Sequence, residues 1–273
     1  MQEAVSFGVS GASRYVISTS GRLSSIARYQ KLLQEELGLD IVYLPISPKD
    51  DHQIIEPDDF VNAIKGLGAI GGAISKDIKT RVIPFLDELD ESAQQVQSVN
   101  TVLRKGPKLI GYNTDAMGFR KAIEKGIADS GLSIHSAVIY GYGGVFNVAN
   151  SVLQGMGIKT YVSGRNDEKV AATAARFGLD PFEGESDLFV NATPVTDTPL
   201  HEASGFLEAL SSSKMAFDHH MPGEQLKIFC QNQSKFYIPG TAMYYPQMMA
   251  QWKIFLQGLV DPDKVEEKLR SLI

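Results

Sequence analysis

The sequence has 273 residues, 43% of them hydrophobic and 21% charged, which is the profile of a globular protein with room for two domains of ordinary size. Its formal net charge is −6 and it has no run of Lys and Arg, which excludes the clustered basic face that binding to a phosphate backbone needs. We therefore expect no nucleic-acid partner. Cys230 is the only cysteine, the N-terminus has no basic segment followed by a long apolar run, and no stretch approaches 18 consecutive apolar residues. We expect a cytoplasmic protein with neither secretion nor a membrane partner.

Apolar strands alternate with amphipathic helices along the first hundred residues. The expected helix at 24–38 begins with a serine and ends with a glycine, and the expected helix at 57–68 begins with a proline. Alternation of this kind predicts crossover connections on a largely parallel sheet. The expected strands lie at 15–19, 40–46, 69–75 and 99–104, and the expected helices at 24–38 and 57–68.

A second alternating block runs from about residue 118 to residue 237. A short apolar strand at 136–141 enters a glycine-rich turn, and a helix is expected from that turn through Gly155. This is the layout of a nucleotide-binding domain. Further strands are expected at 158–163, 187–192 and 215–218, and the final segment is expected to be helical.

The turn after the strand at 136–141 has the sequence GYGGVF. Gly141, Gly143 and Gly144 leave room for the backbone to approach a pyrophosphate, and the N-terminus of the following helix offers unpaired N–H groups and a positive dipole. The third small residue of the dinucleotide fingerprint is replaced by Phe146, whose ring must tilt away or push the helix outward. The pattern predicts a bound dinucleotide, and a purely structural turn is the alternative.

Cofactor choice is set at the end of the next strand, where NAD-binding proteins usually place Asp or Glu and NADP-binding proteins place Arg. This chain reads SGRND there, with Arg165 in the turn and Asp167 two residues later. The sequence favours NADP over NAD. The alternative interpretation of Arg165 is a solvated side chain in a surface turn.

Several polar residues follow strands in the first block. Ser75 and Lys79 come just after the strand at 69–75, where the substrate of an α/β protein usually binds, and Lys76 is a competing lysine. Asn100 and Asp115 stand near strand ends or a helix start. Taken alone, Asp115 fits a helix cap better than a catalyst.

Six segments in this order resemble the shikimate dehydrogenase family, over nearly the full length of the chain. They are AISKDIK, SVNTV, GYNTDAMG, GYGG, NATP and PGTAMYYPQ.

This resemblance implies an α/β fold with two domains and an active site in the cleft between them. Residues 1–104 and 239–273 would form a substrate domain with a mostly parallel sheet, and residues 105–238 a Rossmann-type domain that binds NADP. The C-terminal helices would return to the first domain.

The same resemblance implies roles for individual residues. Lys79 and Asp115 would be the catalytic pair, and Arg165 would bind the 2′-phosphate. Substrate contacts are implied for Ser75, Asn100 and Gln247, and proximity to the nicotinamide for Thr193 and Met243.

The implied reaction is the interconversion of 3-dehydroshikimate and shikimate in the chorismate pathway of aromatic amino acid biosynthesis. Hydride delivery to a ketone builds negative charge on oxygen, which a positioned ammonium can stabilise and protonate, so no metal is needed. The alternatives are a quinate or aminoshikimate dehydrogenase of the same family, or a ligand-sensing homologue with little catalysis. We expect a monomer or a homodimer.

The chain departs from the family pattern in three places. Asp77 replaces a proline and Ala73 an asparagine near the catalytic lysine, and the sequence HHMP follows Asp218 where a tyrosine is expected. His219 and His220 have no third ligand at metal-binding spacing.

The substrate-carboxylate loop reads STSGRLSSIA, as in the shikimate-dehydrogenase-like branch, and it offers three binding residues, Ser20, Arg22 and Ser25.

Overall fold

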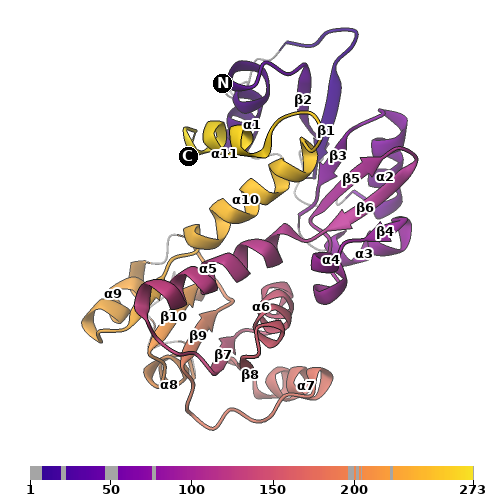
Figure 1. Cartoon of the computed structure of the whole chain (residues 1–273). Coiled ribbons are helices and arrows are strands. Elements are labelled where there is room, and N and C mark those ends of the chain that lie inside the picture. Colours follow the sequence, from indigo (N-terminus) through magenta and orange to yellow (C-terminus); the bar gives the residue numbers. More distant parts are fainter. Residues whose placement is uncertain are drawn as a thin grey trace, which may run out of the picture. The chain divides into compact units, whose positions relative to one another are not determined.

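The structure is a computed structural model that describes residues 8–19, 23–46, 55–75, 78–195, 200, 203, 205–221 and 224–272. The chain divides into two compact units (Figure 1). The first unit comprises Met1–Thr114 and Met248–Ile273, and the second comprises Asp115–Gln247. Each unit contains one sheet with helices packed on it, and most strand pairs are parallel, so the predicted α/β class is confirmed.

The sheet of the first unit has six strands in the order β2-β1-β3-β5-β6-β4. Strand β1 pairs in parallel with both β2 and β3, and β4 pairs in parallel with β6, whereas β5 runs antiparallel to its two neighbours. The parallel strands therefore bring their carboxyl ends to one edge of the sheet. The strands are β1 (Arg14–Ser18), β2 (Ile41–Pro45), β3 (Gly71–Ala73), β4 (Glu88–Leu89), β5 (Thr101–Lys105) and β6 (Lys108–Tyr112).

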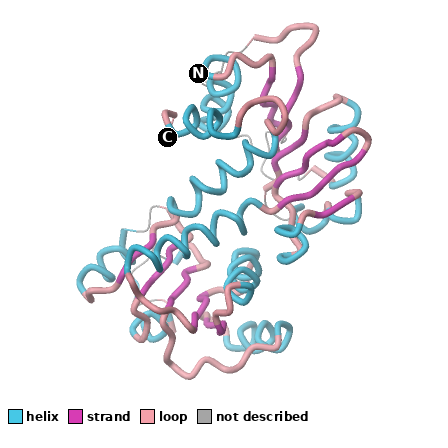
Figure 2. The backbone as a smooth tube through the Cα atoms, in the orientation of Figure 1, coloured by secondary structure: helices cyan, strands magenta, loops and turns pink. Residues whose placement is uncertain are grey.

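Helices lie around this sheet, as the tube in Figure 2 shows. The helix expected at 24–38 consists of an α-helical part followed by a π-helical part. The helices of this unit are α1 (Leu23–Gln30), η1 (Lys31–Glu36), α2 (Pro57–Gly66), α3 (Ile78–Arg81), η2 (Ile83–Phe85), α4 (Glu91–Val96) and α11 (Pro262–Arg270), with the C-terminal part of α10 (Thr241–Phe255).

Two glycines in β3 allow helices to approach both faces of the first sheet. A Cβ atom on Gly72 would lie 2.5 Å from the ring of Phe60 in α2, and one on Gly71 would lie 3.2 Å from the ring of Phe255 in α10. Since neither position has space for a side chain, α2 and α10 both pack closely against β3. On the side of α10, Trp252 is fully buried against the rings of Tyr29 and Tyr43.

The sheet of the second unit has five strands, all parallel, in the order β11-β10-β9-β7-β8. Every residue of β9 and β10 is buried, as expected for central strands that are covered on both faces. The strands are β7 (Ser136–Tyr140), β8 (Lys159–Ser163), β9 (Leu188–Asn191), β10 (Met215–Asp218) and β11 (Phe236–Ile238).

Aromatic contacts fix the helices on the two faces of this second sheet. Phe119 of α5 meets Phe217 of β10 edge to face at 5.0 Å on one side, and Phe206 of α8 meets Phe189 of β9 at 4.9 Å on the other. Such pairs stabilise beyond the area that they bury. The helices of this unit are α5 (Thr114–Ser130, from Asp115 on), α6 (Gly144–Gly155), α7 (Asp167–Phe177), α8 (Phe206–Ser211), α9 (Glu224–Asn232) and the N-terminal part of α10.

The observed units and the expected domains differ at their ends. Residues 105–114 lie in the first unit because β6 pairs with β5 along its whole length, whereas the expected domain limit fell after residue 104. At the other end, α10 contributes its residues up to Gln247 to the second unit. Among the described residues, no helix has both the length and the apolar character that crossing a membrane requires.

Candidate active site

Two hydroxyl groups meet at the carboxyl edge of the first sheet. Ser18 and Ala73 are level with each other at the ends of the parallel strands β1 and β3. Just beyond these ends, the Thr19 and Ser75 hydroxyls lie 3.1 Å apart, and Thr19 Oγ1 accepts a hydrogen bond from the Ser75 N–H at 2.8 Å. Ser75 was an expected substrate contact. Thr19 was not, although the same loop had been singled out.

Lys79 lies in the short helix α3 that follows this edge, and it is half-buried. Its backbone carbonyl accepts a hydrogen bond from the Val99 N–H at 2.8 Å, which ties α3 to the residue before Asn100. The competing Lys76 and the divergent Asp77 lie outside the described residues, as do the expected Ser20 and Arg22. Ser25 is half-buried in α1.

Asn100 is 2% exposed, and its side-chain amide forms hydrogen bonds with other residues of the protein. Its Oδ1 accepts hydrogen bonds from the Thr114 N–H and the Thr101 hydroxyl, both at 2.9 Å, and its Nδ2 donates to Thr114 Oγ1 at 3.0 Å. Gln251 of α10 donates to the same Thr101 hydroxyl at 2.8 Å. Asn100 therefore satisfies the first N–H group of α5, a role that sequence reasoning did not assign to it. Its contact with substrate stays a prediction.

Asp115 occupies the first turn of α5, directly after Thr114, and is half-buried. The preceding Asn113 is fully buried, with its Nδ2 donating to the Ser98 carbonyl at 2.8 Å and its N–H to the Ser92 hydroxyl at 3.0 Å. The backbone on the N-terminal side of Asp115 is thus held by side-chain hydrogen bonds. A carboxylate in this turn also interacts favourably with the helix dipole.

Two expected site residues of α10, Met243 and Gln247, lie against α5 within the second unit. A Cβ atom on Gly118 would come within 2.5 Å of the Met243 carbonyl and 2.7 Å of Gln247 Cβ, so the two helices touch along their backbones. Met243 is 6% exposed, while Gln247 is half-buried. This close packing fixes the position of Gln247 relative to α5.

The glycine turn lies where the strand order of the second sheet reverses. Chain order leads from β7 outward to β8, and then back to β9 on the other side of β7, and ligands of open α/β sheets bind at such a point. Gly141 has a φ of +119°, and a Cβ atom there would lie 2.8 Å from the methyl group of Thr193, so this position requires glycine for both conformation and space.

Gly143 and Gly144 face open space, since a Cβ atom on either would meet no other atom within 4 Å. Helix α6 begins at Gly144, and no side chain caps its first N–H groups. Free N–H groups, a positive helix end and missing side chains are the features that let a backbone cradle phosphate.

Phe146 does not occupy the space above this turn. Its side chain is fully buried and meets Phe177 of α7 edge to face at 5.3 Å. The ring therefore tilts away toward α7, which was one of the two outcomes expected for a bulky residue at this place in the fingerprint.

Arg165 is exposed in the turn between β8 and α7. A Cβ atom on the neighbouring Gly164 would lie 3.0 Å from the ring of Tyr142, which comes from the glycine turn. Lys169 of α7 lies over the same ring at 5.6 Å, so a second cation accompanies Arg165 beside the turn. Lys169 was not among the expected site residues. Its position four residues after Arg165, in the helix that follows, could have indicated that it lies near Arg165.

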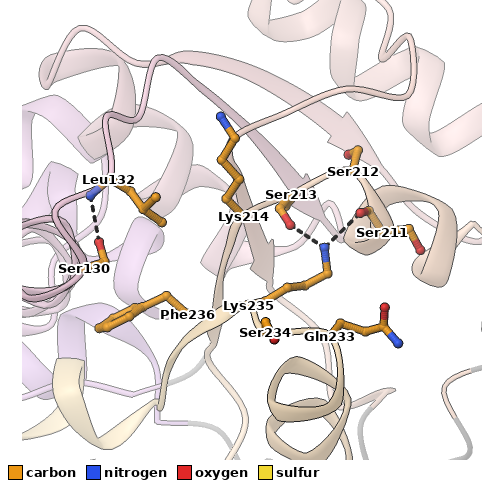
Figure 3. A pocket seen from close by; sticks show the side chains of 10 residues that line it. All are labelled: Ser130, Leu132, Ser211, Ser212, Ser213, Lys214, Gln233, Ser234, Lys235 and Phe236. Atoms are coloured by element: carbon orange, nitrogen blue, oxygen red, sulfur yellow. Dashed lines mark hydrogen bonds between the residues drawn. The ribbon is translucent and has the colours of Figure 1, made fainter.

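A separate hollow of about 610 Å³ lies at the amino edge of the second sheet, away from the glycine turn. Figure 3 shows Lys235 donating to the carbonyls of Ser211 and Ser213 there, at the end of α8. This lysine satisfies carbonyls at a helix C-terminus. The hollow adds nothing to the candidate site.

Several known proteins are similar to this chain. The family model described as the shikimate dehydrogenase substrate binding domain matches residues 21–102. The chain is 28% identical to a shikimate dehydrogenase-like protein of Haemophilus influenzae over 253 residues, 88% of this chain and 89% of that protein. It is 40% identical to a shikimate dehydrogenase (NADP(+)) of Halothermothrix orenii over 124 residues, but this match spans only 44% of this chain and 39% of that protein. The chain is thus similar to proteins of the shikimate dehydrogenase family.

The shared fold extends over both units. A shikimate 5-dehydrogenase from Thermus thermophilus, solved in complex with NADP(H) and shikimate, matches with a TM-score of 0.71 at 23% identity, covering 96% of this chain and all of that one. The predicted two-domain α/β fold is thereby confirmed. The family model also covers Ser25, Ser75, Lys79 and Asn100, the part of the candidate site that lies in the first unit before β6.

Proposed function

We propose that the protein is an NADP-dependent oxidoreductase that interconverts 3-dehydroshikimate and shikimate by hydride transfer. In this proposal the second unit binds NADP and the first unit binds the substrate. The enzyme acts in the cytoplasm, as a monomer or a homodimer. The relatives named as NADP-dependent shikimate dehydrogenases support the reaction, and the Thermus thermophilus complex with NADP(H) and shikimate supports the pair of ligands.

The observation that carries the proposal is the carboxyl edge of the second sheet. The glycine turn, with its two open glycines and uncapped helix, lies at the reversal of strand order, and exposed Arg165 follows the neighbouring strand β8. Asp167, the nearest acid after β8, belongs to the first turn of α7, whose N-cap is Asn166. A basic group therefore stands where an NAD-binding protein places its ribose-binding acid, which favours a 2′-phosphate.

The residues present suit this cofactor. Gly143, Gly144 and the start of α6 would hold the pyrophosphate, and Arg165 with Lys169 would hold the 2′-phosphate. When bound, NADP supplies or accepts the hydride. The chain itself supplies orientation and the proton.

The proton step is assigned to Lys79. Its ammonium stabilises the negative charge that develops on the ketone oxygen and donates a proton to it, and in the reverse direction the neutral amine accepts the hydroxyl proton. Asp115 orients that ammonium, because opposite charges attract each other. Ser20, Arg22, Ser25, Ser75, Asn100 and Gln247 would bind the substrate's carboxylate and hydroxyls, and Thr193 and Met243 the nicotinamide.

An absorbance assay of the reduced nicotinamide tests the function. Purified protein is incubated with NADP⁺ or NAD⁺, each with shikimate, quinate or aminoshikimate. We expect turnover with NADP⁺ and shikimate, its loss in Lys79→Ala, and its retention in Lys65→Ala, which changes an exposed lysine of α2. Higher turnover with quinate or aminoshikimate, or none with any pair, would overturn the assignment.

A further inference from the structure

A dinucleotide held at the carboxyl edge of the second sheet must extend in a definite direction. Arg165 follows β8 and the open glycines follow β7, while β9 and β10 continue the sheet on the other side of β7. If Arg165 takes the 2′-phosphate and the glycine turn takes the pyrophosphate, the nicotinamide half lies across the ends of β9 and β10.

Two polar side chains are buried at those ends. Asn191 is the last residue of β9 and Asp218 the last residue of β10, and the parallel register places them level with each other. Both are fully buried, and Asn191 Nδ2 donates to Asp218 Oδ1 at 2.8 Å. Burying a carboxyl group and an amide is unfavourable unless they are hydrogen-bonded, so this arrangement needs a reason.

Hydrogen bonds lead from this pair into the two loops that follow the strands. Asn191 Oδ1 accepts from the Thr193 N–H at 3.0 Å and from its hydroxyl at 2.7 Å, and Thr193 Oγ1 in turn accepts from the Val195 N–H at 3.3 Å. Asp218 Oδ1 accepts from the His220 N–H at 3.0 Å. One buried pair thus determines the backbone path after both strands.

The position of Thr193 also affects the glycine turn. Its methyl group would be 2.8 Å from a Cβ atom on Gly141, so the loop after β9 packs directly against the turn after β7. A satisfied buried polar network favours a single geometry. Thr193 is therefore held in one position, on the nicotinamide side of the glycine turn.

We propose that Asn191 and Asp218 are positioning residues that fix the loops after β9 and β10 in the shape that receives the nicotinamide half of the cofactor. This inference rests on the proposed function, since it takes NADP as the ligand. Neither residue has to touch the cofactor, because the backbone and hydroxyl of Thr193 and the backbone of His220 transmit their effect.

The binding affinities of two ligands distinguish this positioning role from a general structural role. NADP⁺ has both halves of the cofactor, whereas 2′,5′-ADP has only the adenosine half. By calorimetric titration, we expect Asn191→Ala to weaken NADP⁺ binding about tenfold, the equivalent of one or two lost hydrogen bonds, and to leave 2′,5′-ADP binding within about twofold. The more conservative Asp218→Asn, which keeps the shape of the side chain, should weaken NADP⁺ binding less.

The matched control is Asn150→Ala. Asn150 is also a buried asparagine of the second unit, and its Oδ1 accepts a hydrogen bond from the Thr160 hydroxyl at 2.6 Å, but it lies inside α6. We expect it to lower the melting temperature without separating the two ligands. Equal losses for NADP⁺ and 2′,5′-ADP in Asn191→Ala, or a selective loss in Asn150→Ala, would overturn the inference. If the wild type bound neither ligand, the proposed function itself would fail, a result distinct from these.

Discussion

We propose that a single exposed side chain, that of Arg165, selects the cofactor of this protein. Arg165 projects from the turn after β8, next to Gly164 and the ring of Tyr142 that packs on it. A guanidinium can bind a phosphate with two parallel hydrogen bonds, and such charge-assisted bonds are stronger than neutral ones.

We predict that Arg165→Ala weakens NADP binding by about 1–3 kcal/mol, the range for charge-assisted hydrogen bonds, and leaves NAD binding nearly unchanged. Dissociation constants for both cofactors, measured by titration, check this. Arg176→Ala is the control, since Arg176 is exposed near the other end of α7. Equal losses for the two cofactors would remove Arg165 from the 2′-phosphate site.

Residues that follow a motif could be predicted from the sequence, whereas residues that depend on distant partners could not. The glycine turn and Arg165 stand at fixed places after strands, so the pattern located them. The Asn191–Asp218 pair joins positions 27 residues apart in the chain. The local sequence does not predict that contact, because only the pairing of β9 with β10 makes the two residues neighbours.

At the scale of elements, periodicity predicted the long and well-patterned segments best. Strand β10 has the bounds that were expected, 215–218, and α6 ends at Gly155 as expected. Strand β3 is shorter than expected, because only Gly71–Ala73 pairs with β1 and β5. The two-residue strand β4 was missed, since so short a segment has no periodicity to detect.

Helix α11 is attached to α10 by a charge cluster in the first unit. Glu266 accepts hydrogen bonds from Lys253 of α10 and from Arg270 one turn later. The hydrogen bond from Lys253, followed by that from Arg270, lowers the pKa of Glu266 to about 2. A carboxyl group with a lowered pKa stabilises the folded state above its unfolded pKa of about 4.3 and loses that effect as the pH falls toward 2.

We predict that Glu266→Gln lowers the free energy of unfolding by less than about 1 kcal/mol near neutral pH, because the cluster is partly exposed. The difference from wild type should shrink as the pH falls from about 4 toward 2 and then vanish. Melting temperatures across this pH range provide the measurement. Glu267→Gln, at the exposed neighbouring position, should show a smaller difference. A difference that is constant with pH would mean that the charge of Glu266 contributes nothing.

At the scale of the whole molecule, the alternation of strands and helices along the chain predicted two α/β units. The ends of these units depend on which strands and helices pair with one another. The hairpin of β5 and β6 keeps residues up to Thr114 in the first unit, and α10 is divided between the two units at Gln247. Neither limit coincides with a change in composition, so a sequence pattern could not locate it. Lys79 consequently belongs to the first unit, and Asp115 is the first residue of the second.

We predict that Lys79 and Asp115 act as one catalytic unit. Because the ammonium matters most when charge builds on the ketone oxygen, Lys79→Ala should lower kcat by roughly 10²–10⁴ with a smaller change in KM. Asp115→Asn should also lower kcat, since it removes the negative charge that orients the ammonium. Steady-state kinetics of the two single variants and the double variant form a cycle, and the double variant should be little worse than the poorer single one.

Two results would contradict this pairing. If Lys79→Ala kept a near-normal kcat with only KM raised, Lys79 would bind the substrate rather than transfer a proton. If Asp115→Asn stayed active but melted earlier, Asp115 would serve the start of α5, where a carboxylate in the first turn stabilises the helix by about 0.3–1 kcal/mol. Asp129→Asn is the matched control, because Asp129 lies in the last turns of the same helix and forms an exposed pair with Lys125. That change should leave both kcat and the response to Lys79→Ala as they are in the wild type, which separates coupling between Lys79 and Asp115 from a general effect of charge on α5.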